Sequence, residues 1–383
     1  MFTSTKQKSM VGLDIEAGSL AATEVSANGR VVVTRHGVAP LSPGVFREGE
    51  VVDAEELGSA LKELFARHKL PRNVRLGIAN QRVAVRTLHL PPIDNADELE
   101  TAIRFQAQDH IPMPLDQAVL DWEVVGHQTL ENGERRIEVV AVAARRDMLG
   151  SVMEALGRAG LRPVGIDLSA FGMIRALAAE QHAAVGAAGF VTAPVPYEDR
   201  YGEGVAPGTT APTAVASPAA PARLYCNLGD VVNLAVAQGK SCLFTRISPF
   251  GVEGIAQKLA ERRQLTLEHA RQWLGHVGLE SPTDEIEGNP ETVSAAREAL
   301  AEGAAKLVDE LRLSLEFYGT QEGAVGVEGV VACGPGTTIP GLVERLQRDL
   351  GFPCHVGRPR ALEHLDEASA ARLTLSYGLA LEG

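Results

Sequence analysis

Two segments of the chain, residues 11–33 and 224–244, share one pattern of apolar and polar positions. Each has an apolar run, a polar residue (Asp14 in the first, Asn227 in the second), a turn of small residues, an alternating run, a second turn and a last apolar run. Apolar residues at every second position are typical of strands that bury one face. The repeated pattern therefore predicts two related subdomains that each begin with a β-hairpin.

Other stretches have apolar residues at helical spacing. The clearest is 53–68, where leucines recur every three or four residues behind an acidic first turn. The stretch 94–110 begins with Asn95 and has Glu98 three residues later, which is a signal for the start of a helix. Further helices are expected at 146–159, 254–263, 266–274, 290–319 and 368–381.

The order of these elements predicts an α/β fold with two lobes. Residues 83–162 follow a strand, helix, strand, strand, helix pattern and are expected to form a small inserted α+β subdomain. The first lobe is assigned to 1–82 and 163–182, and the second lobe to 223–383. Between the lobes, 183–222 is rich in Pro, Gly and Ala and offers little apolar surface to bury, so a disordered linker is expected there.

Composition narrows the classes of function. The 383 residues carry 36 Lys and Arg against 49 Asp and Glu, a net charge of −13 that repels nucleic acid. Four cysteines without a CxxC pair favour a reducing compartment over a disulfide framework. No stretch resembles a secretory signal or a membrane span, because prolines interrupt the charge-free run 204–222. We therefore expect a cytoplasmic protein that reaches a membrane through a partner.

Most catalytic motifs are absent from the chain. Gly239, Lys240 and Ser241 imitate the end of a Walker A loop, but Leu234 stands where its first glycine is required, so a hairpin turn is expected instead. No GxSxG, HExxH or EF-hand pattern occurs, and the ten histidines lack metal-ligand spacing. These observations argue against a serine hydrolase and against a histidine-metal site.

Three glycine-containing loops at strand ends remain as candidates, at 14–19, 227–230 and 333–336. Such loops expose backbone N–H groups that can bind phosphates, and a carboxylate in a hairpin can bind Mg²⁺ or orient a water. The alternative is that each glycine only permits a left-handed turn. Both interpretations stay open from the residues alone.

With these loops in this order, the chain resembles the actin-like ATPase superfamily, with its ribonuclease H-like lobes, and within it the PilM family of type IV pilus assembly. FtsA is a more distant relative, and the small inserted subdomain is of the SHS2 type. The segments that carry the resemblance include VGLDIEAGSLAATEV, LPPIDNADELETAIRFQAQDHIPMPLDQAVLDWEVVG, NLGDVVNLAVAQGKSCLFTRISPFG and VACGPGTTIPGLVERLQRDLG. The helix followed by Ile-Pro, at 99–114, is the most specific part.

The resemblance implies a nucleotide site between the lobes. It assigns ATP binding to residues of the three loops and of one helix, with Asp14 also as the Mg²⁺ ligand. These residues are Asp14, Gly18, Ser19, Asn227, Gly229, Glu310, Gly334 and Gly336.

Three departures from the family pattern weaken that expectation. Glu16 stands in place of a glycine, Ala21 in place of a lysine, and Asn227 in place of an aspartate. A negative Glu16 opposes phosphate, and an amide cannot act as a base. We therefore expect weak ATP and Mg²⁺ binding at best, in a pseudo-ATPase rather than an enzyme. The alternative is that Glu16 points to solvent and Asp230 substitutes nearby.

The resemblance also implies a partner. PilM-like proteins bind the cytoplasmic tail of the membrane protein PilN and join other platform or motor proteins of the pilus, at the inner face of the cell membrane. The groove between the first lobe and the inserted subdomain is the expected binding site, with Phe105 and Ile111 as contact candidates. The rivals are an ATP-dependent kinase of the same fold and an FtsA-like filament protein at the membrane.

Overall fold

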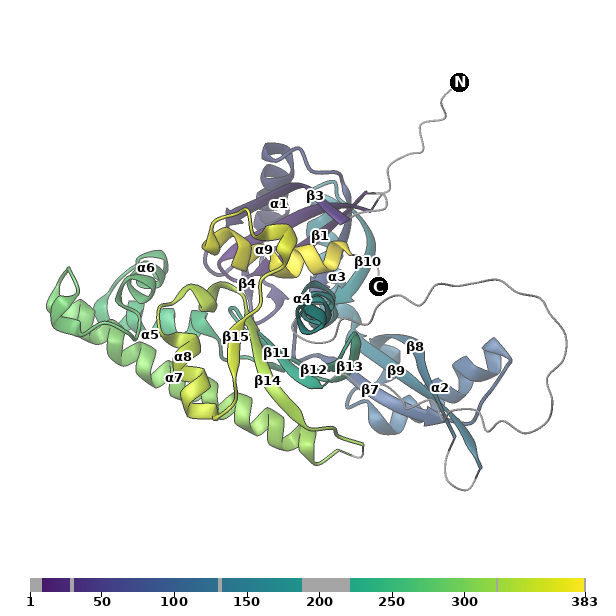
Figure 1. Ribbon diagram of the computed structural model, residues 1–383. Helices are drawn as coiled ribbons and strands as arrows, with labels where there is room; N and C mark the ends of the chain where they lie inside the picture. The colour runs from purple at the N-terminus through teal and green to yellow at the C-terminus, as the bar shows by residue number, and fades with distance from the viewer. Residues whose placement is uncertain (1–8, 28–30, 130–132, 188–220, 322, 382–383) are drawn as a thin grey trace, which may run out of the picture.

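The computed structural model describes residues 9–27, 31–129, 133–187, 221–321 and 323–381. Two five-stranded sheets and one three-stranded sheet organise this part of the chain (Figure 1). Helix α4 (Ser169–Ala187) extends into the segment 183–222, which was expected to be the linker, and strand β11 begins at its last residue, Ala222. Apart from these ends and Pro221, the expected linker lies outside the described residues.

The first sheet has the strand order β10-β6-β1-β2-β3. β1 pairs antiparallel with β2 in the expected hairpin, and β6 runs parallel to β1 and to β10. A short two-stranded ribbon, β4 with β5, follows β3 in the chain. The strands are β1 Ser9–Glu16, β2 Ser19–Ala27, β3 Val31–Pro40, β4 Phe46–Arg47, β5 Glu50–Val51, β6 Asn73–Ile78 and β10 Arg162–Leu168.

The second sheet has the order β13-β12-β11-β14-β15 and begins with the second expected hairpin. Helices α5, α6, α7 and α8 pack on one face of it and form with it the largest core among the described residues. The strands are β11 Ala222–Leu228, β12 Val232–Gln238, β13 Ser241–Ser248, β14 Val327–Cys333 and β15 Cys354–Val356. The helices are α5 Val252–Arg263, α6 Leu267–Val277, α7 Pro290–Gly319 and α8 Leu342–Leu350.

Two helices, α4 Ser169–Ala187 and α9 Glu367–Ala380, lie between the two large sheets. Their apolar residues share one core with β2 of the first sheet and with Tyr225, Ala235 and Val331 of the second. Close packing is possible because Gly12 of β1 faces the Ser376 carbonyl and Gly378 faces the Gly172 carbonyl, where added Cβ atoms would overlap backbone. The C-terminal helix α9, which was assigned to the second lobe, thus packs on the first sheet.

The third sheet, β7-β9-β8, stands apart with helix α2 on one face. Its strands are β7 Val83–Leu90, β8 Ala118–Thr129 and β9 Arg135–Arg145, and its helix is α2 Ala96–His110, capped by the Asn95 side chain. Most of its apolar residues form two clusters of their own, whereas Ala144, with Val83, Val85 and Val142, packs in the core of the first lobe. The strand, helix and hairpin part of the expected insert therefore packs as a small α+β unit.

Helix α3 Arg146–Arg158, expected inside that insert, packs against helix α1 Ala54–Arg67 of the first lobe. Met148, Val152 and Leu156 are buried in the same core as Leu57 and Leu61.

Among the described residues, no helix is both long and apolar enough to cross a membrane.

Candidate functional site at the hairpin junction

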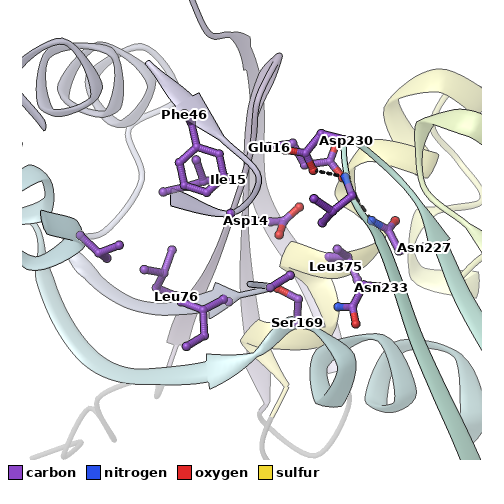
Figure 2. Close-up of a pocket in the computed structure, with 16 residues that line it drawn as sticks. Asp14, Ile15, Glu16, Phe46, Leu76, Ser169, Asn227, Asp230, Asn233 and Leu375 are labelled. Carbon is purple, nitrogen blue, oxygen red and sulfur yellow. Dashed lines mark hydrogen bonds between the residues drawn. The ribbon is translucent and has the colours of Figure 1, made fainter. Parts of the chain in front are cut away.

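The two hairpins meet directly, so the turn of each lobe contacts the turn of the other (Figure 2). The Ala17 N–H at the β1–β2 turn donates to Asp230 Oδ2 at 2.9 Å. In the other direction, Asn227 Nδ2 donates to Glu16 Oε1 at 3.2 Å. Alternation along β1 places Val11, Leu13 and Ile15 in the core and turns Asp14 toward the junction.

Glycines make this approach possible. A Cβ on Gly229 would overlap Glu16 Oε1, and a Cβ on Gly334, which has a φ of +85°, would overlap Asn227 Oδ1. Gly336 packs against Leu228 in the same way. The loop at 333–336, which was expected to bind ATP, thus packs onto the end of β11, and the glycines serve contacts within the protein.

Arg271 of α6 adds a contact from the second lobe to the first. Its guanidinium occupies the space that a side chain at Gly18 would need, and its Nε donates to Glu253 Oε2 of α5 at 2.8 Å. The cation is therefore paired with a carboxylate of its own lobe while it covers the turn of the other lobe.

Burial dominates the electrostatics of the junction. It raises the pKa of Asp14 to about 7, with the Asp230 charge as the second cause, and it raises the pKa of Asp230 to about 6. The pKa of Glu16 is well above its ordinary value, first through burial and then through Asp230 and Asp14, although the Asn227 hydrogen bond and Arg372 act in the opposite direction. Neighbouring carboxyl groups in little water favour protonated forms.

We tested whether Mg²⁺ and ATP fit these residues. The cavity beside Asp14, Glu16 and Asp230 has a volume of about 20 Å³, room for one or two waters. Its acidic wall opposes a triphosphate, and in the part of the chain described no three His, Cys, Asp or Glu side chains are placed to bind a metal ion. The nucleotide does not fit this arrangement.

The structure gathers most of the predicted site residues in one place. Asp14, Gly18, Ser19, Asn227, Gly229, Gly334 and Gly336 lie on the two hairpins and the glycine loop. Glu310 lies elsewhere, where its carboxylate is 3.7 Å from Arg246 on β13. Of the partner candidates, Phe105 is 70% exposed, whereas Ile111 is buried beside Ala84 and Ala107.

Arg271 and Asn233 were not predicted as site residues from the sequence, and Asp230 was considered only in an alternative, as a nearby substitute. Asp230 and Ala17 are 213 positions apart in the sequence, and no local pattern relates Arg271 to Gly18. The one available signal was a second carboxylate near the Asn227 turn.

A larger cavity of about 400 Å³ lies where three sheet edges meet, and we call it the edge groove. Among the described strands, β7, β10 and β13 each end their sheet. The walls of the edge groove include Ile78 and Leu168, which are the last residues of the parallel strands β6 and β10. Open α/β sheets commonly bind ligands at this end of their strands. The other walls are Asn80, Gln81, Val83, Val85, Arg86, Ala170, Asn233, Thr245, Arg246 and Ile247.

Asn233 of β12 is the unusual member of this set. Its side chain is 1% exposed, and neither its Nδ2 nor its Oδ1 has a hydrogen-bond partner among the described residues. It lines both the small cavity and the edge groove. A buried amide without partners is costly, so each such group calls for an explanation.

Comparison with known proteins gives a family match and likenesses in fold. Residues 12–189 match the family of the type IV pilus assembly protein PilM. Over 97% of this chain and 97% of the other, the structure is similar to a PilM–PilN type IV pilus biogenesis complex, with a TM-score of 0.74 and 23% identity. It is also similar to MreB5 of Spiroplasma citri bound to ADP, with a TM-score of 0.51 and 11% identity over 97% of this chain and 94% of that one.

These likenesses confirm the expected fold class. The chain has the two-lobed actin-like ATPase fold. The match to the PilM family begins inside β1 and extends over the rest of the first sheet and the whole three-stranded sheet. It includes the segment at 99–114, the most specific part of the sequence resemblance.

Proposed function

We propose that this chain is a PilM-like scaffold of type IV pilus assembly that docks on the cytoplasmic tail of a PilN-like membrane protein. The family match over 12–189 and the likeness to a PilM–PilN complex support this role. Through that partner, the chain lies at the inner face of the cell membrane and joins other platform or motor proteins.

The edge groove is the observation that carries the docking proposal. Along the outer edge of β13, alternate residues direct backbone N–H and C=O groups away from β12, and β7 does the same on its open side. An extended peptide pairs with such an edge and seats every second side chain in a pocket. The apolar residues Val83, Val85 and Ile247 provide that pocket.

Asn233 fits the same ligand. A peptide group presents one N–H donor and one C=O acceptor, which match the two unpartnered atoms of the Asn233 amide. Arg86 lines the same groove, where its guanidinium donates to the carbonyls of Val85 and His110, and it suits an acidic residue in the peptide. Arg246 also lines the groove, but its guanidinium is 3.7 Å from the Glu310 carboxylate. Phe105 remains a proposed second contact, on the exposed face of α2.

We propose that the hairpin junction, which has no room for a nucleotide as the lobes stand, binds ATP and Mg²⁺ weakly at best and only with the lobes parted, without useful hydrolysis. The acidic wall and the 20 Å³ volume support this proposal, as does the amide of Asn227 where a base would be needed. The protein then acts through its partner rather than through a reaction.

Vesicle flotation tests the docking role. The full chain is mixed with liposomes that contain the full-length PilN-like protein of the same organism, and it should float with them but not with empty liposomes. Val85→Glu should abolish flotation by placing a charge in the groove, whereas Val125→Glu, on the exposed side of β8, should not. Equal flotation of both variants would contradict the site, and no flotation of the wild type would contradict the function.

A further inference from the structure

The three-stranded sheet β7-β9-β8 has two faces, and helix α2 packs on one of them. We call the opposite face the open face. On it, residues of β8 and β9 stand side by side in register: Val119 with Ala144, Asp121 with Val142 and Glu123 with Val140. Among the described residues, the apolar side chains of the open face that pack on the first lobe lie at its base, namely Val83, Val85, Val142 and Ala144.

Beyond that base, the open face exposes apolar surface. Val119 is 41% exposed, and Val125, the extra residue of a bulge in β8, is 52% exposed. Val140 of the central strand β9 is half-buried. An apolar sheet face is normally buried against a second layer of structure. The outer strands of a three-stranded sheet lie about 10 Å apart, which is the diameter of one α-helix, so the open face has room for a single helix.

The open face also carries three carboxylates. Asp121 and Glu123 are exposed on β8. The Glu138 side chain reaches across to the same strand, where its Oε2 would be 3.1 Å from a Cβ added to Gly126. None of the three carboxylates forms an ion pair with another described residue. Negative charge therefore borders the exposed valines.

Basic groups near the open face do not offset these carboxylates. Near one end of β9, Arg136 pairs with Glu134 at 3.3 Å. At the other end of β9, Arg145 pairs with Asp147. His89 of β7 adds one exposed imidazole to the face. The balance of the open face is therefore acidic.

We propose that the open face docks a basic amphipathic helix of a partner protein other than the PilN-like one. The helix forms a third layer, with α2 on the far side of the sheet. Asp121 and Glu123 lie about 7 Å apart along β8, which is close to the distance of about 6 Å between Lys or Arg residues one turn apart on a helix. Apolar residues on the same side of that helix cover Val119 and Val140. This interaction goes beyond the docking of the PilN-like tail and does not depend on it.

The charge and the shape of the open face separate this occupant from others. The carboxylates repel anionic lipid, and a second copy of this chain carries a net charge of −13. A strand added to the outer edge of β8 is opposed by the bulge at Val125, which interrupts the regular edge. A cationic helix meets neither obstacle.

Fluorescence anisotropy of the full chain with two labelled synthetic peptides tests the charge preference. Each peptide has about 15 residues with Leu at helical spacing, flanked by Lys in one peptide and by Glu in the other. The Lys peptide should bind, and the Glu peptide should bind at least about tenfold more weakly. Asp121→Lys with Glu123→Lys should weaken binding of the Lys peptide at least about tenfold. The matched control, Asp284→Lys with Glu285→Lys on an exposed turn of the second lobe, makes the same change in net charge and should bind as the wild type.

Hydrogen–deuterium exchange locates the bound peptide without any substitution. An excess of the Lys peptide should slow exchange in 118–127 and leave 96–110 of α2 unchanged. Equal binding of the two peptides, an equal loss in the variant and its control, or protection of α2 instead of β8 would overturn the proposal.

The flotation assay separates this proposal from the docking role. The Asp121→Lys, Glu123→Lys variant should still float with liposomes that contain the PilN-like protein. Lost flotation of that variant would assign the open face to the PilN-like partner and overturn the proposal of a separate one.

Discussion

Glu16 is the side chain that separates this junction from a site for a polyphosphate. Its carboxyl group lies against Gly229 and accepts a hydrogen bond from Asn227, so it fills space between the lobes. The sequence left open whether Glu16 would face solvent, and the structure places it in the junction instead. Asp230 does lie nearby, but it caps the opposite turn and adds negative charge.

The pKa of Asp14 predicts how stability depends on pH. Because its folded-state pKa of about 7 exceeds the ordinary value of 3.8, its contribution to stability is present below about pH 4 and is lost as the pH rises through 7. Between about pH 5 and pH 8, the free energy of unfolding should fall by about 2 kcal/mol more in the wild type than in Asp14→Asn. Urea denaturation at several pH values measures this difference, and parallel profiles of the two proteins would refute it.

Gly229→Ala should destabilise the protein by about 1–3 kcal/mol, because its Cβ would overlap Glu16 Oε1. The second change Glu16→Ala should recover part of that loss by removing the overlapping carboxyl group. Thermal denaturation of the two single variants and the double variant measures the coupling. Gly275→Ala, on α6 with nothing within 4 Å, is the matched control and should be neutral or slightly stabilising. Additive losses would mean that the two residues do not share a contact.

Among the secondary-structure elements, those with strong local signals were predictable from the sequence. The helix start at Asp53, the cap at Asn95 and the proline at the start of α7 are all set by neighbouring residues. Both hairpins also followed from their alternating pattern. Such features depend on hydrogen bonds and burial within a few residues, so the sequence specifies them without tertiary information.

The packing of α3 and α9 was not predictable in the same way. Each helix has an apolar face, but that face does not say which sheet it will cover. Arg75 and Arg175 donate to carbonyls at the end of α9, contacts that join residues more than 200 positions apart. The site residues Asp230, Arg271 and Asn233 could not be predicted for the same reason, because they meet the rest of the site only in the folded chain.

The three-stranded sheet should be removable as a unit. Val83 and Ala144 are paired neighbours at its base, so a short Gly-Ser loop can join the chain there while α3 keeps its place against α1. The shortened protein should keep a cooperative melting transition and lose the PilN-like partner, because β7 forms one wall of the edge groove. Scanning calorimetry and the flotation assay measure the two effects. Retained flotation would place the interface elsewhere.

In the molecule as a whole, the hairpin junction and the edge groove are joined through one residue. Asn233 of β12 contacts both the small cavity at the hairpin junction and the edge groove. The groove lies where the edge strands β10 of the first lobe, β13 of the second lobe and β7 of the three-stranded sheet come together. A partner bound there would contact all three units at once.

Asn233→Leu should separate stability from function. Leucine is similar in size and leaves no buried amide unpartnered, so the melting temperature should rise or stay unchanged. The loss of the amide should weaken partner binding at least about tenfold, since a partner peptide group would be left without its donor and acceptor. Calorimetric melting and peptide titration measure the two quantities. A variant that is less stable yet binds normally would show that Asn233 has internal partners instead.

The most direct measurement is an isothermal titration of the full chain with a synthetic peptide of the PilN-like cytoplasmic tail, with and without Mg-ATP. We predict binding in the absence of nucleotide, an affinity that Mg-ATP changes less than about twofold, loss of binding in Val85→Glu and normal binding in Val125→Glu. Binding that requires Mg-ATP, or that is equal in both variants, would contradict a nucleotide-independent scaffold with its partner in the edge groove.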